Sequence, residues 1–186
     1  MKGSMVMIYL FLAEGFEEIE ALTPVDYLRR AGIGVTTVGV GGKQIVGAHN
    51  IAVTADITTA ELPDDVMLDG VVLPGGMPGT LNLEKDEKVM HFVKRAFSEN
   101  KLLCAICAAP SVLGHAGMLN GKTATCYPGF EDDLTGADVT GAPVETDGNI
   151  ITARGAGVAA DFAFAIIAAV KDPQTADAVC RQIQSK

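Results

Sequence analysis

Short apolar runs alternate with helix-like segments along this chain, and this alternation restricts its fold more than any other feature. The first run, Val6 to Ala13, is continuously apolar, which is typical of a strand buried on both faces. Residues 14–32 follow with acidic residues at the start and two arginines before Gly32, which predicts a helix. Pro24 predicts a kink in this helix or a start nearer to the proline. A strand followed by a helix is the repeating unit of α/β proteins.

The same pattern continues towards the C terminus. Further strands are predicted over residues 34–40, 69–76, 101–107 and 123–128, with an extended segment at 49–56 and a hairpin-like pair at 142–154. Helices are predicted over residues 82–100, 108–117 and 158–170, the last buried because it is apolar nearly all round, and a short one is predicted from the capping-box spacing of Thr58 and Glu61. We therefore expect a doubly wound, mostly parallel sheet with helices on both faces, and ligands at the carboxyl ends of its strands. Because no repeat or linker divides the chain, residues 1–186 should form one domain.

Charge and composition exclude several classes of partner. The chain has 14 Lys and Arg against 23 Asp and Glu, a net charge of −9, and no basic cluster that would attract nucleic acid. The first apolar run is far shorter than the roughly 20 residues of a membrane span, and no signal-peptide pattern surrounds it. The four cysteines lack the spacing of a disulfide scaffold. We expect no membrane partner, a cytoplasmic location and free thiols.

Cys107 is the main candidate for a reactive residue. It ends an apolar strand and is followed at once by Ala108, Ala109 and Pro110, with the proline placed for a first helical turn. A cysteine at a helix N-terminus can have its pKa lowered to about 3.5–7.5, which favours the nucleophilic thiolate. The alternative interpretation is a small buried apolar residue. The strand-to-helix elbow makes catalysis or sensing the preferred interpretation.

The other cysteines give weaker signals. Cys104 and Cys107 form a C-x-x-C pattern, but three steps of extended strand separate their Cα atoms by about 10 Å, whereas a disulfide needs about 4.4–6.8 Å. Cys104 should therefore lie in the core. Cys126 lies in a segment that could approach the crevice, and Cys180 is expected to pack on the last helix beside Val179 and Ile183.

Four segments in order resemble the ThiJ/PfpI superfamily, in the branch of the parkinsonism-associated protein deglycase (DJ-one) and its bacterial relatives. They read AEGFEEIEALTPVDYLRRAGI, VVLPGG, AICAAP and TARGAG, and the likeness covers nearly the whole chain. The resemblance implies a flavodoxin-like fold of the class I glutamine amidotransferase type, a homodimer and no cofactor.

The resemblance also places other residues near Cys107. Glu20 matches the family glutamate that lies against the cysteine, although on sequence alone it would be an ordinary solvated helix residue. A carboxyl beside a thiolate in a partly dry pocket tends to stay protonated and can donate a hydrogen bond. Gly75 and Gly76 leave their backbone N–H groups open to close approach, and with the N–H of Ala108 they would form an oxyanion hole. A plain tight turn is the alternative for the two glycines.

The sequence departs from the family in three places. Tyr127 stands where members often carry a histidine, and with a pKa of about 10 it is a poor base, so we assign it at most an accessory role. Ala108 follows the cysteine where peptidase-like and amidotransferase-like branches carry histidine, which disfavours a protease. His49 replaces an arginine of the human relative.

The sequence predicts no metal site and no catalytic role for arginine. His49, His91 and His115 share no metal-ligand spacing with a cysteine or carboxylate. Arg29 and Arg30 are expected to serve the negative end of their helix, and Arg154 either stabilises an interface or faces the crevice.

Two functions of different class remain. The first, implied by the resemblance, is cofactor-independent conversion of a reactive dicarbonyl such as methylglyoxal, or of an early glycation adduct, to a hydroxy acid by Cys107 and Glu20. The second is a non-enzymatic sensor of oxidative stress and chaperone, in which peroxide converts Cys107 to a sulfinic acid. A scaffold that carries the thiol without catalysis is the third alternative.

Overall fold

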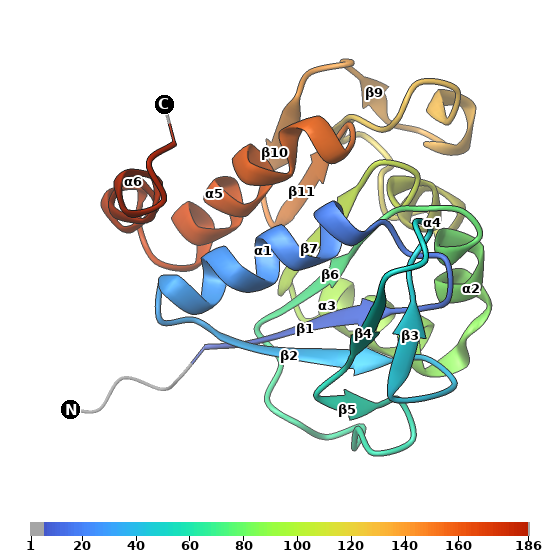
Figure 1. Ribbon diagram of the computed structural model, residues 1–186. Coiled ribbons are helices and arrows are strands. Elements are labelled where there is room, and N and C mark those ends of the chain that lie inside the picture. The colour runs from blue at the N-terminus through green and yellow to red at the C-terminus, as the bar shows by residue number, and fades with distance from the viewer. Residues whose placement is uncertain (1–5, 186) are drawn as a thin grey trace.

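The central sheet of the computed structural model has seven strands in the order β10-β11-β7-β6-β1-β2-β5 (Figure 1). The structure describes residues 6–185. The strands are β1 (Met7–Leu12), β2 (Gly34–Gly39), β5 (Ile57–Thr58), β6 (Gly70–Leu73), β7 (Leu102–Ile106), β10 (Val144–Asp147) and β11 (Ile150–Ala153). All neighbouring pairs are parallel except β10 and β11, which form the predicted hairpin. The prediction of a doubly wound, mostly parallel α/β sheet is therefore confirmed.

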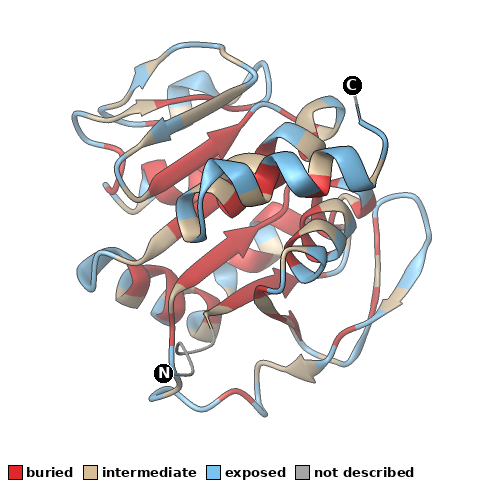
Figure 2. Cartoon of the chain, turned by 90° about the vertical axis from the view of Figure 1, so that its left-hand side faces the viewer, coloured by how far each residue is buried: buried red, intermediate tan, exposed pale blue. Residues whose placement is uncertain are grey.

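Helices cover both faces of this sheet (Figure 1). They are α1 (Glu18–Arg30), α2 (Gly79–Lys85), α3 (Glu87–Ser98), α4 (Pro110–His115), α5 (Ala159–Val170) and α6 (Pro173–Gln182), with 3-10 turns η1 (Glu131–Asp133) and η2 (Ala156–Val158). Side chains alternate along β1, so that Ile8 and Leu10 face α1, α5 and α6 while Tyr9 and Phe11 face α2, α3 and α4. The strands and the inner sides of the helices form the buried core (Figure 2).

Two helix predictions are corrected by the structure. The segment 82–100 holds two helices, because Asp86 adopts an extended conformation and its carboxylate accepts the N–H of Val89 at 2.9 Å, which caps α3. The short helix predicted after Thr58 is wrong. The carboxylate of Glu61 does accept the N–H of Thr58 at 2.7 Å, but Pro63 disfavours a helical conformation at the preceding residue, and the segment forms a turn.

Small strands complete the fold. β3 (Gln44–Val46) pairs antiparallel with β4 (Ala52–Thr54), which lies inside the predicted extended segment, and β8 (Thr123–Ala124) pairs with β9 (Asp138–Val139). α1 starts at Glu18 and continues through Pro24. Within residues 6–185 none of the helices combines the length and apolar character needed to cross a bilayer.

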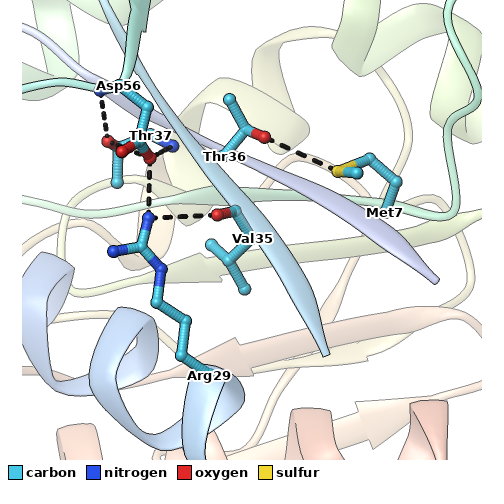
Figure 3. Close-up of polar contacts among 6 residues, drawn as sticks. All are labelled: Met7, Arg29, Val35, Thr36, Thr37 and Asp56. Atoms are coloured by element: carbon cyan, nitrogen blue, oxygen red, sulfur yellow. Dashed lines mark hydrogen bonds and ion pairs between the residues drawn. The ribbon is translucent and has the colours of Figure 1, made fainter. Parts of the chain in front are cut away.

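The C-terminal end of α1 is tied to β2 by a polar network (Figure 3). Arg29 donates to the carbonyl of Val35 at 3.1 Å and to the carboxylate of Asp56 at 2.6 Å. The N–H and hydroxyl of Thr37 donate to the same carboxylate, each at 2.8 Å. Beside this network the hydroxyl of Thr36 contacts the sulfur of Met7 at 3.5 Å. The network fixes α1 along the sheet, so that its acidic first turn lies near the carboxyl ends of the strands.

Candidate active site

Cys107 lies at the sharp turn between β7 and α4. Its φ is +65°, in the left-handed region that non-glycine residues rarely adopt, and its N–H donates to the carbonyl of Ala153 on β11 at 2.8 Å. Such strain costs about 1–3 kcal/mol and is typical of a strand-to-helix turn that presents a nucleophile. The structure thus places this half-buried thiol at an elbow at the carboxyl edge of the sheet.

Glu20 lies in the first turn of α1, and its side chain is 1% exposed. Its carboxyl accepts the N–H of Gly75 at 2.9 Å and also hydrogen bonds to the backbone of Ala156 and to the thiol of Cys107. Burial raises the pKa of Glu20 from 4.5 to about 7, although the hydrogen bonds from Cys107 and Gly75 oppose the shift. The fold therefore brings together the carboxyl and the thiol, which are far apart in the sequence.

The ionisation of Cys107 differs from the prediction made from its place before a helix. Burial raises the pKa of its thiol to about 12, and the negative charge of Glu20 adds to the shift. Hydrogen bonds from the backbone N–H groups of Ala108 and Gly76 oppose it but are weaker. The predicted lowering of the pKa is wrong, because burial of the thiol and the nearby carboxylate of Glu20 outweigh the N-terminus of α4, a helix of only six residues.

The thiol and the carboxyl therefore act as one titrating unit that holds a single proton from about pH 7 to about pH 12. That proton has two places, on the sulfur of Cys107 or on the carboxyl of Glu20. The N–H groups of Gly76 and Ala108 stabilise a thiolate, whereas the N–H of Gly75 stabilises a carboxylate. The arrangement allows a direct proton transfer between sulfur and oxygen.

Gly75, which follows β6, has a different role from the one predicted. A Cβ atom on Gly75 would lie 2.6 Å from the Cβ of Cys107 and 2.6 Å from a carboxylate oxygen of Glu20, so a larger residue does not fit. The N–H of Gly75 is directed to Glu20 and is not available to an oxyanion. Of the three predicted donors, only Gly76 and Ala108 direct their N–H groups towards the sulfur.

Tyr127 lies beside the elbow. Its N–H donates to the carbonyl of Cys107 at 2.8 Å, and the residue is 50% exposed. It borders a cavity of about 410 Å³, lined by Tyr127, Pro128, Arg154, Gly155, Ala156, Gly157 and Val158. A larger cavity of about 580 Å³ is lined by residues that precede strands, such as Asp69 and Lys101, and so belongs to the opposite edge of the sheet.

The other cysteines are less suited to chemistry. Cys104 is fully buried, as predicted, and burial raises its pKa well above the usual value. Burial, together with the charges of Glu131 and Asp133, raises the pKa of Cys126 to about 11. Cys180 is half-buried on α6 and contacts the carbonyl of Ser185 at 3.7 Å. All four thiols are free, as the sequence predicts.

One group of side chains near the site has the composition of a metal site. Ligand atoms of Glu17, Glu18 and His49 lie within 4.8 Å of one another, a proximity that their sequence separation conceals. Oε1 of Glu18 accepts the N–H of His49 at 2.8 Å and that of Ile51 at 3.4 Å. The other oxygen of Glu18, Oε2, lies 3.0 Å from Nδ1 of His49. Burial alone raises the pKa of Glu18, but these hydrogen bonds outweigh it and lower the pKa. The hydrogen bonds to Glu18 thus close the turn at 47–51.

Comparison with known proteins identifies the family. Residues 6–169 match the DJ-1/PfpI family. The chain belongs to the DJ-1/PfpI family. The Parkinson disease protein 7 homolog of Danio rerio is 37% identical over 162 residues, which cover 85% of this chain and 86% of that protein. A deglycase of Pyrococcus abyssi is 35% identical over 151 residues, covering 79% of this chain and 89% of that protein.

Solved structures agree with this family. A cysteine-to-alanine mutant of a DJ-1 superfamily protein from Salmonella typhimurium has a TM-score of 0.92 and 34% sequence identity, with 98% of this chain and all of that chain covered. Drosophila melanogaster DJ-1beta has a TM-score of 0.92 and 32% identity over the same shares of the chains. The predicted resemblance to this family and the predicted α/β fold are therefore confirmed.

Proposed function

We propose that this DJ-1/PfpI protein is a cofactor-free, cysteine-dependent enzyme that converts reactive dicarbonyls, or early glycation adducts, to hydroxy acids. Relatives named as deglycases support a deglycase-type or stress-related role. The observation that carries the proposal is the hydrogen-bonded pair of Cys107 and Glu20 at a left-handed elbow. A nucleophile in contact with a group that gives and takes a proton near neutral pH is what covalent catalysis on a carbonyl needs.

The reaction begins when the proton of the pair resides on Glu20. The thiolate of Cys107 attacks the aldehyde carbon of methylglyoxal, a carbon–sulfur bond forms, and the resulting oxyanion takes the proton of Glu20 to give a hemithioacetal. The N–H groups of Gly76 and Ala108, which lie at the sulfur, donate to the developing charge.

Glu20 then moves a second proton. As a carboxylate it removes the hydrogen of the former aldehyde carbon as a proton, giving an enediolate, and it returns this proton to the neighbouring carbon. The hydroxyl proton of the former aldehyde carbon passes to the neighbouring oxygen, which leaves a thioester on Cys107. Water hydrolyses the thioester, which releases the hydroxy acid and restores the thiol. The sum is the addition of one water to the dicarbonyl, so no oxidant or cofactor is required.

The test is incubation of the protein with methylglyoxal and measurement of D- and L-lactate. We expect turnover by the natural protein and loss of at least 10²-fold in Cys107→Ser, because the step requires a strong nucleophile. Cys180→Ser changes the other half-buried thiol and is the matched control. Absence of turnover, or undiminished turnover in Cys107→Ser, would refute the proposal.

A sensor and chaperone role is the second candidate, and the two backbone donors at the sulfur favour it. A sulfinate formed on Cys107 would keep the bonds from Gly76 and Ala108 and accept one from protonated Glu20. Mass spectrometry after mild peroxide treatment tests it. Addition of two oxygens to Cys107 alone, with negligible dicarbonyl turnover, would favour sensing, whereas equal reaction of all four thiols would contradict it.

We further propose that the protein forms a homodimer through the outer face of α1. Ile19 and Leu22 are 53% and 37% exposed on successive turns of one helix face, and Ile51, also 53% exposed, lies in the turn bound by Glu18. Exposed apolar clusters of this kind mark interfaces. Sedimentation should show a dimer that Ile19→Glu dissociates, while Phe97→Glu, on the opposite side of the sheet, should not. A monomeric natural protein would refute this arrangement.

A cytoplasmic location is also proposed, since a reducing compartment keeps cysteines such as these four as free thiols.

A further inference from the structure

Within residues 6–185 Arg154 has no ion-pair partner, whereas most arginines of this chain have one. It follows β11, and its N–H donates to the carbonyl of Pro143 at 3.1 Å. Arg29, Arg30 and Arg95 each contact a carboxylate. Over residues 6–185, the exposed guanidinium of Arg154 has no hydrogen bond or ion pair with another residue.

Arg154 is one of the residues that line the cavity of about 410 Å³ beside the elbow. The cavity lies in the size range of small-molecule sites. Among its lining residues, all within the described part of the chain, Arg154 is the cation, and the phenol of Tyr127 is a further hydrogen-bond donor. The rest of the wall consists of apolar side chains and glycine backbone.

The cavity wall is bonded to both reactive groups. The N–H of Tyr127 donates to the carbonyl of Cys107 at 2.8 Å, and the backbone of Ala156 hydrogen bonds to the carboxyl of Glu20. Two residues of the cavity wall are thus in direct contact with Cys107 and Glu20, which themselves do not line the cavity.

The charge of the surroundings makes an unpaired guanidinium notable. The protein carries a net charge of −9, and Glu17, Glu18 and Glu20 all lie on the first turn of α1 or directly before it. Such a field repels anions. An arginine left without a carboxylate partner in this field is available to bind an anionic ligand, and its planar fork fits a carboxylate or a phosphate.

We propose that Arg154 binds an anionic group of the substrate, a carboxylate or a phosphate, and so holds the reacting carbonyl at Cys107. The preferred substrate is then a small dicarbonyl or glycation adduct that carries one carboxylate or phosphate. The carbonyl part of this inference rests on the proposed function, but the anion site does not.

Alkylation of Cys107 tests the anion site without requiring turnover. Iodoacetate and iodoacetamide both form a carbon–sulfur bond and release iodide, but iodoacetate alone carries a carboxylate. Arg154→Gln should lower the ratio of the iodoacetate rate to the iodoacetamide rate roughly tenfold, and Arg154→Lys should lower it less. Arg181→Gln removes the same charge from α6 and should leave the ratio unchanged. An unchanged ratio in Arg154→Gln, or an equal change in Arg181→Gln, would overturn the inference.

A protection experiment separates the two anions. Acetate and inorganic phosphate are each titrated against the rate at which iodoacetamide modifies Cys107. If acetate slows this modification, the site binds a carboxylate, and if phosphate slows it, the site binds a phosphate. In either case Arg154→Gln should abolish the slowing. If neither ion protects, the inference is wrong. If methylglyoxal is not turned over but Arg154→Gln still lowers the ratio of the iodoacetate rate to the iodoacetamide rate, only the proposed function is refuted.

Discussion

The carboxyl of Glu20 accepts the N–H of Gly75 at 2.9 Å in a space that leaves no room for a side chain on the glycine. The bond joins the first turn of α1 to the loop after β6. Because Gly75 also lies against Cys107, this loop sets how closely the carboxyl and the thiol approach each other.

The first prediction concerns this space. Gly75→Ala places a methyl group 2.6 Å from both Glu20 and Cys107 and should lower the free energy of unfolding by about 1–3 kcal/mol, with loss of Cys107 reactivity. Gly42→Ala is the control, since its added carbon would meet no atom nearer than 4.0 Å. Chemical denaturation and alkylation rates measure the two effects. A Gly75→Ala protein as stable and reactive as the Gly42→Ala protein would show that the space is not needed.

The second prediction concerns the stability of the buried carboxyl. The pKa of Glu20 is about 7 in the folded protein against 4.5 unfolded, so its stabilising contribution is complete below about pH 4.5 and is lost as the pH rises through about 7. Glu20→Gln keeps the neutral form at every pH. Relative to this variant, the natural protein should lose up to roughly 3 kcal/mol of unfolding free energy between pH 4.5 and 8.

Denaturation series at several pH values measure that difference. Glu87→Gln changes an exposed carboxyl on α3 and should not reproduce it. If the difference between the natural protein and Glu20→Gln stays constant with pH, the carboxyl does not titrate in a buried site.

Strands and the elbow were predictable from the sequence because each depends on neighbours along the chain. A continuous apolar run ending in a cysteine and followed by Pro110 is a local pattern. The division of the helix at Asp86 was missed, although an N-cap residue before Glu87 is also a local signal.

Contacts between distant segments could not be read in this way. Glu20 lies far from Cys107 in sequence and was placed beside it by family resemblance alone. The ionisation of Cys107 was predicted with the wrong sign, since the local pattern shows the helix but not the burial or the nearby charge that outweigh it. The contact of His49 with Glu18 and the unpaired state of Arg154 likewise depend on the assembled fold.

The third prediction concerns His115 at the end of α4. Its ring lies 2.7 Å from Glu84 and 3.4 Å from Asp133, and the hydrogen bond that the ring donates to the carboxylate of Glu84 raises the pKa of His115 above 6.5. The contribution of these ion pairs to the free energy of unfolding is therefore complete below pH 6.5, and it is lost as the pH rises past the pKa of His115 in the folded protein. Since the ring is 43% exposed, we expect His115→Gln to cost roughly 0.2–1 kcal/mol at pH 5.5 and less at pH 8.5.

Thermal denaturation at the two pH values measures this cost. His91→Gln, a histidine of similar exposure whose nearest carboxylate lies at 3.8 Å, is the matched control. A larger effect of His115→Gln at pH 8.5 than at pH 5.5 would contradict the assigned ion pairs.

The last prediction decides where the single proton of the catalytic pair resides. If it resides on Glu20, the thiolate of Cys107 forms as the pair loses its first proton, and the iodoacetamide rate should rise through about pH 7 and then level off. In Glu20→Gln no carboxyl can take the proton, but the charge that raises the thiol pKa is also absent. The midpoint of that variant should fall between about 7 and about 12. Both profiles are measured in a Cys180→Ser background. The opposite result is an iodoacetamide rate of the natural protein that keeps rising towards pH 12, with a midpoint at higher pH than that of Glu20→Gln. This result would place the proton on sulfur and remove the nucleophile that the proposed reaction requires.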